Sequence, residues 1–236
     1  MPKKGSLGKV ERLVVKLSGS LFQPDVKYSD IQPFTKLFSD LRRSGIKMVL
    51  VAGGGKNART YINAARGLGA DESTLDELGI MVSRLNAMLM IVGLGESAYP
   101  SVPTSLAEVA KAFNETGLVV VGGLHPGQST NAVACLIAER IRADLFLNTT
   151  SVDGVYTANP KTSKAAKRLS TVSTKELEKI LSGSAMGAGT YELMDPVALR
   201  IIERSKIPSR ITLCSTEVIK QVLNGENVGT ILTSGK

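Results

Sequence analysis

Two stretches near the start of the chain decide the fold: residues 13–20, LVVKLSGS, and residues 48–59, MVLVAGGGKNAR. Each is a short aliphatic run that ends in glycine beside a cation. Similar runs occur at residues 118–123, 144–149 and 209–215. Continuous apolar strands of this length are typical of a sheet that is covered on both faces. The pattern therefore predicts strands of a buried, mostly parallel sheet.

Amphipathic segments lie between these runs and predict helices. Within residues 28–45, Ser29 and Gln32 match a capping box, apolar side chains recur at helical spacing, and Gly45 ends the helix. Further helices are expected over residues 57–68, 76–93, 131–142, 174–181 and 196–206. Residues 157–170 indicate a mobile basic loop. Alternating strands and helices with right-handed crossovers predict an α/β fold with a doubly wound sheet.

The composition restricts the classes of partner. The chain has 236 residues, no Trp and a formal net charge of +8. The charge suits nucleotides or other anions, or serves only solubility. Nucleic-acid binding would rest on charge alone, and the few aromatic residues argue against a base-stacking RNA module.

The same composition indicates a compartment. Cys135 and Cys214 have neither a CxxC nor a metal-ligand spacing, so both are expected as reduced, half-buried thiols. No apolar run approaches the roughly 18 residues that span a membrane. Residues 1–10 are basic and lead into no signal-like segment. We therefore expect a cytoplasmic protein with a flexible N-terminus and no membrane partner.

The two glycine loops suit phosphate binding. Ligands of open α/β sheets bind beyond the carboxyl ends of strands, where these loops lie. Residues 53–55 have no Cβ atoms, so backbone N–H groups can approach an anion, and the following helix directs its positive end at the same point. Lys16 and Arg59 add positive charge. One glycine run alone would more often be a tight turn, but two runs with cations favour a ligand.

Two further loops follow predicted strands. Residues 119–133, VVVGGLHPGQSTNAV, combine glycines with Ser129 and Thr130 at a helix start. His125, the only histidine, is expected to face solvent or pack in this loop. Residues 148–162, NTTSVDGVYTANPKT, contain an Asp-Gly turn and a tyrosine that could lie across a purine ring.

Several rival motifs are absent or incomplete. The chain has no GxxxxGK[ST] P-loop, HExxH, GxSxG or Cys/His cluster. Gly53, Gly55 and Ala58 match the dinucleotide pattern GxGxxA, but no acidic residue follows at the end of a second strand, which disfavours a dehydrogenase. Phosphoryl transfer onto a phosphate fits better. Such an acceptor is already an anion and needs no general base, so two adjacent glycine loops could hold donor and acceptor phosphates end to end.

The whole set of motifs resembles the amino-acid-kinase superfamily, most closely its archaeal-type uridylate (UMP) kinases. The matching strings include KLSGS, VAGGGKNARTYI, LDELGIMVSRLNAMLM, HPGQST, VDGVYTANP and DPVALRIIERSKI. The resemblance implies a three-layer α/β/α sandwich in one domain over residues 11–236, with acceptor binding in its N-terminal part and ATP binding in its C-terminal part. It also implies phosphorylation of UMP to UDP in pyrimidine biosynthesis, Mg²⁺ carried with ATP, and a homohexamer.

The resemblance also implies roles for individual residues, with Lys16 and Arg59 as the catalytic pair and no protein metal ligand. ATP would contact Lys16, Leu17, Ser18, Gly19, Ser20, Gly54, Arg59, Thr150, Ser151, Tyr156 and Asn159. UMP would contact Gly53, Asp76, Leu124, His125, Pro126, Gly127, Gln128, Ser129 and Thr130. The carboxylate of Asp76 would accept hydrogen bonds from the UMP sugar.

Three positions depart from the family pattern. Asn131 stands where many relatives have Asp, Ser151 where they have Asn, and Asn159 where they have Asp. We expect these changes to alter donor affinity or rate. They are also the only support for a non-catalytic nucleotide- or anion-binding relative. An isopentenyl phosphate kinase is the nearest enzymatic alternative, but such enzymes carry a histidine shortly after the first glycine loop, which LSGSLFQPD lacks. Kinases of free carboxylates fit HPGQST less well.

Overall fold

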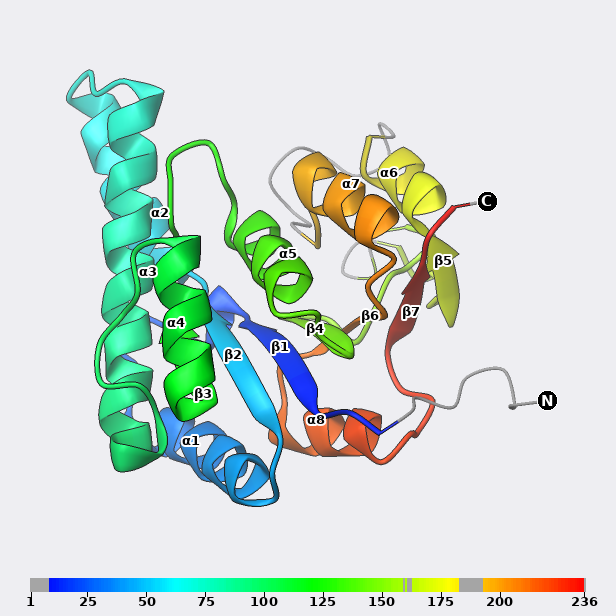
Figure 1. Cartoon of the computed structure of the whole chain (residues 1–236). Coiled ribbons are helices and arrows are strands. Elements are labelled where there is room, and N and C mark those ends of the chain that lie inside the picture. The colour runs from blue at the N-terminus through cyan, green and yellow to red at the C-terminus, as the bar shows by residue number, and fades with distance from the viewer. Residues whose placement is uncertain (1–8, 159, 161–162, 183–192, 236) are drawn as a thin grey trace.

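The strands of the described chain lie side by side in one sheet (Figure 1). The computed structural model describes residues 9–158, 160, 163–182 and 193–235. Within these ranges the strands are β1 (Arg12–Leu17), β2 (Lys47–Ala52), β3 (Leu118–Val121), β4 (Leu145–Thr150), β5 (Thr171–Ser173), β6 (Ser209–Leu213) and β7 (Thr230–Thr233). Their order is β3-β2-β1-β4-β6-β7-β5, and all neighbours are parallel except β6 and β7. The predicted mostly parallel sheet is confirmed.

Helices cover both faces of this sheet. The described ones are α1 (Tyr28–Arg43), α2 (Gly55–Gly67), α3 (Glu72–Leu94), α4 (Leu106–Thr116), α5 (Thr130–Arg140), α6 (Thr174–Ser182), α7 (Pro196–Ser205) and α8 (Thr216–Leu223). Apolar residues of α4, α5, α6 and α7 share one core cluster, and those of α1, α3 and α8 share another. Along β1, Val14 belongs to the first cluster, while Leu13 and Val15 belong to the second. The three-layer α/β/α architecture is therefore confirmed.

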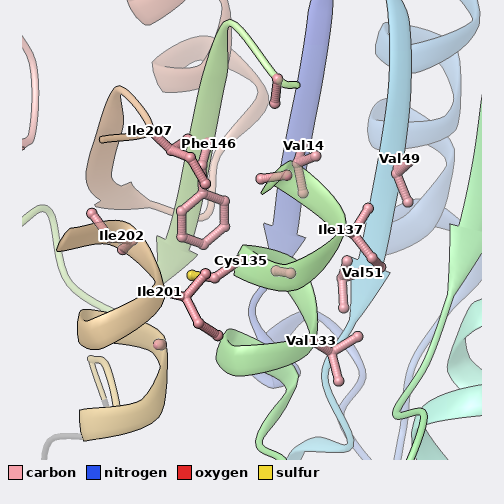
Figure 2. Packing of buried hydrophobic residues seen from close by; sticks show 14 of the residues in the cluster. Val14, Val49, Val51, Val133, Cys135, Ile137, Phe146, Ile201, Ile202 and Ile207 are labelled. Atoms are coloured by element: carbon pink, nitrogen blue, oxygen red, sulfur yellow. The ribbon is translucent and has the colours of Figure 1, made fainter. Parts of the chain in front are cut away.

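The packing of α5 shows how the sheet becomes covered. Val133, Cys135 and Ile137 are fully buried on this helix and lie against side chains of β1, β2 and β4 and of α7 (Figure 2). Burying an aliphatic side chain contributes about 1.5–3 kcal/mol each. Because α5 is apolar on nearly every side, it is the central helix of its layer and holds the loop before it against the strand ends.

The start of α1 differs from the sequence-based expectation. The helix begins at Tyr28, and the carboxylate of Asp30 accepts the backbone N–H of Lys27 at 2.9 Å. The predicted capping box of Ser29 and Gln32 is wrong, because an acid at the third helical position satisfies the first free N–H. The end is as expected, since Gly45 follows the helix with φ of +98°.

Several short elements escaped the sequence patterns. Helices α4 and α8 were not predicted, nor were β5 and β7, which span 3 and 4 residues. The two strands carry too few residues for a periodic signal. Length does not explain why α4 was missed, because its 11 residues equal those of the predicted α5. The described residues of the basic segment 157–170 form no helix and no strand of the sheet, as a loop predicts, and an antiparallel bridge joins Tyr156 to Arg168. Residues 1–8 of the predicted flexible N-terminus lie outside the described residues.

Helix α3 corrects the expectation about membrane-length segments. The helical stretch Glu72–Ser97 has a mean hydropathy of 1.7 over its most apolar window and is long enough to cross a membrane by length and composition alone. A core helix of a soluble protein passes the same test. In this chain α3 packs against β2, β3, α1 and α2.

Candidate active site

Four loops meet at one edge of the sheet. They follow the carboxyl ends of β3, β2, β1 and β4, which are adjacent and parallel, with Leu17 paired to Ala52 and Val51 paired to Val121. The carboxyl ends of adjacent parallel strands share an edge, so the loops predicted to bind ligand are brought together.

The first two loops touch backbone to backbone. A Cβ atom on Gly19 would lie 2.5 Å from the Cα of Gly55, and one on Gly55 would lie 2.3 Å from the carbonyl oxygen of Gly19. Gly55 also has a φ of +66°, a left-handed conformation that glycine adopts without strain. The N–H of Gly53 donates to the carbonyl oxygen of Leu17 at 3.2 Å. The expected adjacency of the two glycine loops is confirmed.

Thr149 on β4 organises the end of β1. Its hydroxyl donates to the carbonyl oxygen of Lys16 at 2.8 Å and accepts the N–H of Ser18 at 3.2 Å. The Ser18 hydroxyl in turn accepts the N–H of Ser20 at 3.2 Å and starts the short 3-10 helix Gly19–Leu21. The backbone of this loop is therefore held before any ligand arrives.

Lys16 places a cation at the junction of the loops. Only 8% of its surface is exposed. Burial raises the pKa of the neighbouring Cys214 thiol, and the Lys16 ammonium opposes part of that rise. Arg59 lies on the exposed side of α2, one turn beyond the glycine loop. The site thus combines a buried cation, Lys16, with an exposed one, Arg59.

Two buried side-chain amides, one on α5 and one on β4, converge on a single carbonyl oxygen. The amide groups of Asn131 and Asn148 both donate to the carbonyl oxygen of Leu193, at 3.4 and 2.6 Å. The side-chain oxygens (Oδ1) of Asn131 and Asn148 have no hydrogen-bond partner among the described residues. A carboxylate at Asn131 would lose the donated hydrogen bond, so the amide at this position has a structural partner.

The loop over residues 124–130 forms a tight turn that is tied to two helices. The N–H of Gln128 donates to the carbonyl oxygen of His125, and Gly127 between them has a φ of +80°. The N–H of Gly127 donates to a carboxylate oxygen of Asp76 at 2.7 Å. Asp76 lies in the second turn of α3 rather than at a helix start, because α3 begins at Glu72. Its carboxylate thus orders the loop that the family resemblance assigns to UMP.

Ser129 and its neighbours complete this loop. Ser129 caps α5 by accepting the N–H of Ala132 at 3.0 Å, as its position predicted, and its hydroxyl donates to Asp195, the residue that caps α7. Leu124 is buried, while His125 is exposed, as expected from the sequence. Pro126 is exposed and Thr130 half-buried.

The fourth loop carries the residues predicted for the adenosine. The Thr150 hydroxyl donates to the carbonyl oxygen of Val152 at 2.8 Å, so it shapes the loop, and Ser151 is exposed. The Tyr156 hydroxyl donates to Asp153 at 2.6 Å, which raises the pKa of that tyrosine. Asn159 lies outside the described residues.

Polar residues of α3 were missed by sequence reasoning. Ser83, Arg84 and Asn86 hydrogen-bond the backbone of the second and third loops. A signal was available, because these residues interrupt the otherwise apolar run of residues 79–95. Polar side chains in such a helix need buried partners.

Three comparisons relate the chain to known proteins. The model of the amino acid kinase family matches residues 11–213. A uridylate kinase from Hyperthermus butylicus is 44% identical over 222 residues, which cover 94% of this chain and 97% of that protein. The crystal structure of uridylate kinase from Archaeoglobus fulgidus has a TM-score of 0.84 at 39% identity, covering 94% of this chain and 99% of that one. The structure of UMP kinase from Bacillus anthracis, with a TM-score of 0.81 at 20% identity over 97% of this chain and 98% of that one, shares the fold.

Proposed function

Because the chain belongs to the amino acid kinase family, we propose that it transfers the terminal phosphoryl group of ATP to UMP, giving UDP and ADP. The backbone contact between Gly19 and Gly55 is the observation that carries this proposal. Two loops this close can hold a donor and an acceptor phosphate end to end, and relatives over nearly the whole length are uridylate kinases. The product would serve pyrimidine nucleotide synthesis in the cytoplasm.

The proposed mechanism relies on position and charge. The UMP phosphate is already an anion at neutral pH, so its oxygen attacks without a general base. Backbone N–H groups of the two glycine loops and the ammonium of Lys16 neutralise the charge that spreads over the transferring group. Such preorganised donors, aimed at developing charge in a site that excludes water, are usually the largest contribution to catalysis. Arg59 approaches from α2 and adds charge on the ATP side.

The two halves of the sheet would divide the substrates. Gly53, Asp76 and the loop 124–130 lie in the N-terminal half and would bind UMP. The adenosine would lie against the fourth loop, where the half-buried ring of Tyr156 is held through Asp153. This division treats residues 11–236 as one domain.

Magnesium would enter with the ATP. Among the described residues, no group of three or more His, Cys, Asp or Glu side chains could hold a metal ion. Mg²⁺ commonly binds through substrate phosphates and retained water rather than in a cage of protein ligands. Magnesium bound in this way would neutralise phosphate charge beside Lys16.

Self-association is proposed for the outer face of α3. Met81, Leu85, Met88 and Val92 recur at helical spacing and are 40–73% exposed. A contiguous exposed apolar stripe on a helix marks an interaction surface. Covering it with the same stripe of a second copy would give a homo-oligomer, and the resemblance points to a hexamer.

Product analysis tests the proposed reaction. Wild type would be mixed with Mg-ATP and, in separate tubes, UMP, CMP and isopentenyl phosphate. Lys16→Ala should abolish UDP formation. The matched control Lys47→Ala, at the exposed start of β2 on the far edge of the sheet, should retain it. Saturable nucleotide binding without transfer to any acceptor would refute the kinase and favour a binding protein; transfer only to isopentenyl phosphate would assign a different substrate.

A further inference from the structure

Helix α3 contacts the backbone of two separate ligand loops through three polar residues that lie within about one turn. The guanidinium of Arg84 donates to the carbonyl oxygens of Gly123 and Leu124, at 3.0 and 3.1 Å. The Ser83 hydroxyl accepts the N–H of Gly123 at 2.7 Å. One helix thereby holds the third loop through both its carbonyl oxygens and an N–H.

The same helix holds the second loop. The side-chain amide of Asn86 donates to the carbonyl oxygen of Gly53 at 2.8 Å, and only 6% of Asn86 is exposed. A buried amide that loses its partner is costly, so this contact is strongly favoured once the helix is packed. Gly53 and Gly123 follow different strands, β2 and β3. Both are nevertheless held by residues of α3 that lie within three positions of one another.

These contacts determine where the loop N–H groups point. A trans peptide is planar, and its C=O and N–H groups point in opposite directions. When Asn86 holds the carbonyl oxygen of Gly53, the N–H of Gly54 in the same peptide points away from α3. When Arg84 holds the carbonyl oxygens of Gly123 and Leu124, the N–H groups of Leu124 and His125 also point away from it.

Those N–H groups are available to a ligand. Among the described residues, no hydrogen-bond acceptor is found for the N–H of Gly54, Leu124 or His125. A row of backbone N–H groups without protein partners forms an anion-binding concavity. The loop also cannot move toward the helix, since a Cβ atom on Gly122 would lie 2.6 Å from the backbone nitrogen of Arg84.

We propose that Arg84, Ser83 and Asn86 are positioning residues of the phosphoryl-transfer site, which aim the N–H groups of both loops from one rigid helix. Arg84 acts on the loop after β3, which is proposed to bind UMP. Asn86 acts on the glycine loop after β2, which is proposed to contact both UMP and ATP. This inference rests on the proposed function, because it assigns the aimed N–H groups to the phosphates of UMP and ATP.

Arg84→Met tests the acceptor side, since methionine keeps an apolar stem but has no donor. Arg42→Met is the matched control: the Arg42 guanidinium donates to the carbonyl oxygen of Thr116 at 2.9 Å, at the C-terminal end of α4 and away from the ligand loops. Calorimetric titration should show the dissociation constant of UMP raised about tenfold in Arg84→Met, as expected for the loss of hydrogen bonds from a charged donor. The dissociation constant of ATP should stay unchanged in both variants.

Amide hydrogen exchange gives a second readout that needs no substrate. The N–H of Gly123, which donates to the Ser83 hydroxyl at 2.7 Å, should exchange faster in Arg84→Met than in Arg42→Met, because the loop is no longer held by the helix. Equal exchange and equal UMP affinity in the two variants, with a wild type that makes UDP, would refute the positioning role and leave the proposed function intact. A wild type that neither binds nor phosphorylates UMP would refute both.

Asn86→Asp tests the shared loop with an isosteric change. The carboxylate cannot donate to the carbonyl oxygen of Gly53, so both KM values should rise and kcat should fall. Asn86→Gln, which retains a donor on a longer side chain, should recover part of the activity. Full activity in Asn86→Asp at wild-type stability would overturn the role of Asn86.

Discussion

Replacing Gly55 by alanine should damage both stability and catalysis, and Gly69→Ala separates the two causes. Both glycines have positive φ, +66° and +86°. An alanine in the left-handed region costs about 1–2 kcal/mol at either position. A Cβ atom on Gly69 meets nothing within 4 Å, whereas one on Gly55 lies 2.3 Å from the carbonyl oxygen of Gly19.

The clash sets the additional cost of Gly55→Ala. Ordinary contacts begin at 3.4 Å, so the two loops must separate by about 1 Å, and overpacking of this kind costs about 1–3 kcal/mol more. The total loss should be about 2–5 kcal/mol for Gly55→Ala, against about 1–2 kcal/mol for Gly69→Ala. A displacement of about 1 Å between reacting groups can lower the rate about 100-fold.

Urea unfolding and a UDP-formation assay measure these two effects separately. Gly55→Ala should lose kcat/KM by about 100-fold even at temperatures where it is fully folded, while Gly69→Ala should retain wild-type kcat/KM. Equal stability losses in the two variants, together with wild-type activity of Gly55→Ala, would refute the close approach of the loops as the basis of catalysis.

Three further outcomes are expected. Arg204 holds the pKa of the Glu139 carboxyl below its usual value, so Glu139→Gln should lower the free energy of unfolding by about 0.5 kcal/mol at pH 7, measured with urea. A carboxyl whose pKa is lowered by folding stabilises the protein at pH values above its unfolded-state pKa, so the difference between variant and wild type should vanish as the pH falls below about 4. A difference that persists at pH 3 would contradict the ion pair. Asn131→Asp should lower the free energy of unfolding by about 1–3 kcal/mol at pH 7, because it loses a buried donor and buries a charge, and by less at pH 5; a more stable variant would show that the amide is not needed. Burial raises the pKa of both thiols, so iodoacetamide should modify Cys214 only slowly at pH 7.5 and faster above pH 9, with Cys135 unmodified until the protein unfolds; rapid labelling of Cys135 would contradict its burial.

Much of the framework follows from local patterns. The aliphatic runs predict β1, β2, β3, β4 and β6, because a strand buried on both faces needs apolar residues at every position. Glycine at residues 19 and 53–55 predicts loops at the strand ends. The order of the motifs along the chain resembles that of the amino acid kinase family. The short β5 and β7 and the capping of α1 by Asp30 were not predicted, since three or four residues carry no period and several acids can compete for one cap.

The individual residues of the candidate site divide in the same way. Ser129 as a helix cap and the exposed His125 were anticipated from their neighbours in sequence. The hold of Arg84 on Gly123 was not, nor was the shared carbonyl oxygen of Leu193, because each partner lies far along the chain.

Residue types and their spacing along this chain therefore determine which segments become strands, helices and glycine loops able to bind phosphate. They can do so because the burial pattern and the backbone preference of a segment depend on only a few neighbouring residues. Only the folded chain decides that Gly19 and Gly55 touch, that Asp195 binds Ser129, and that α3 aims two loops at once. Those contacts join residues tens of positions apart, and their geometry depends on how every helix packs on the sheet rather than on any local signal.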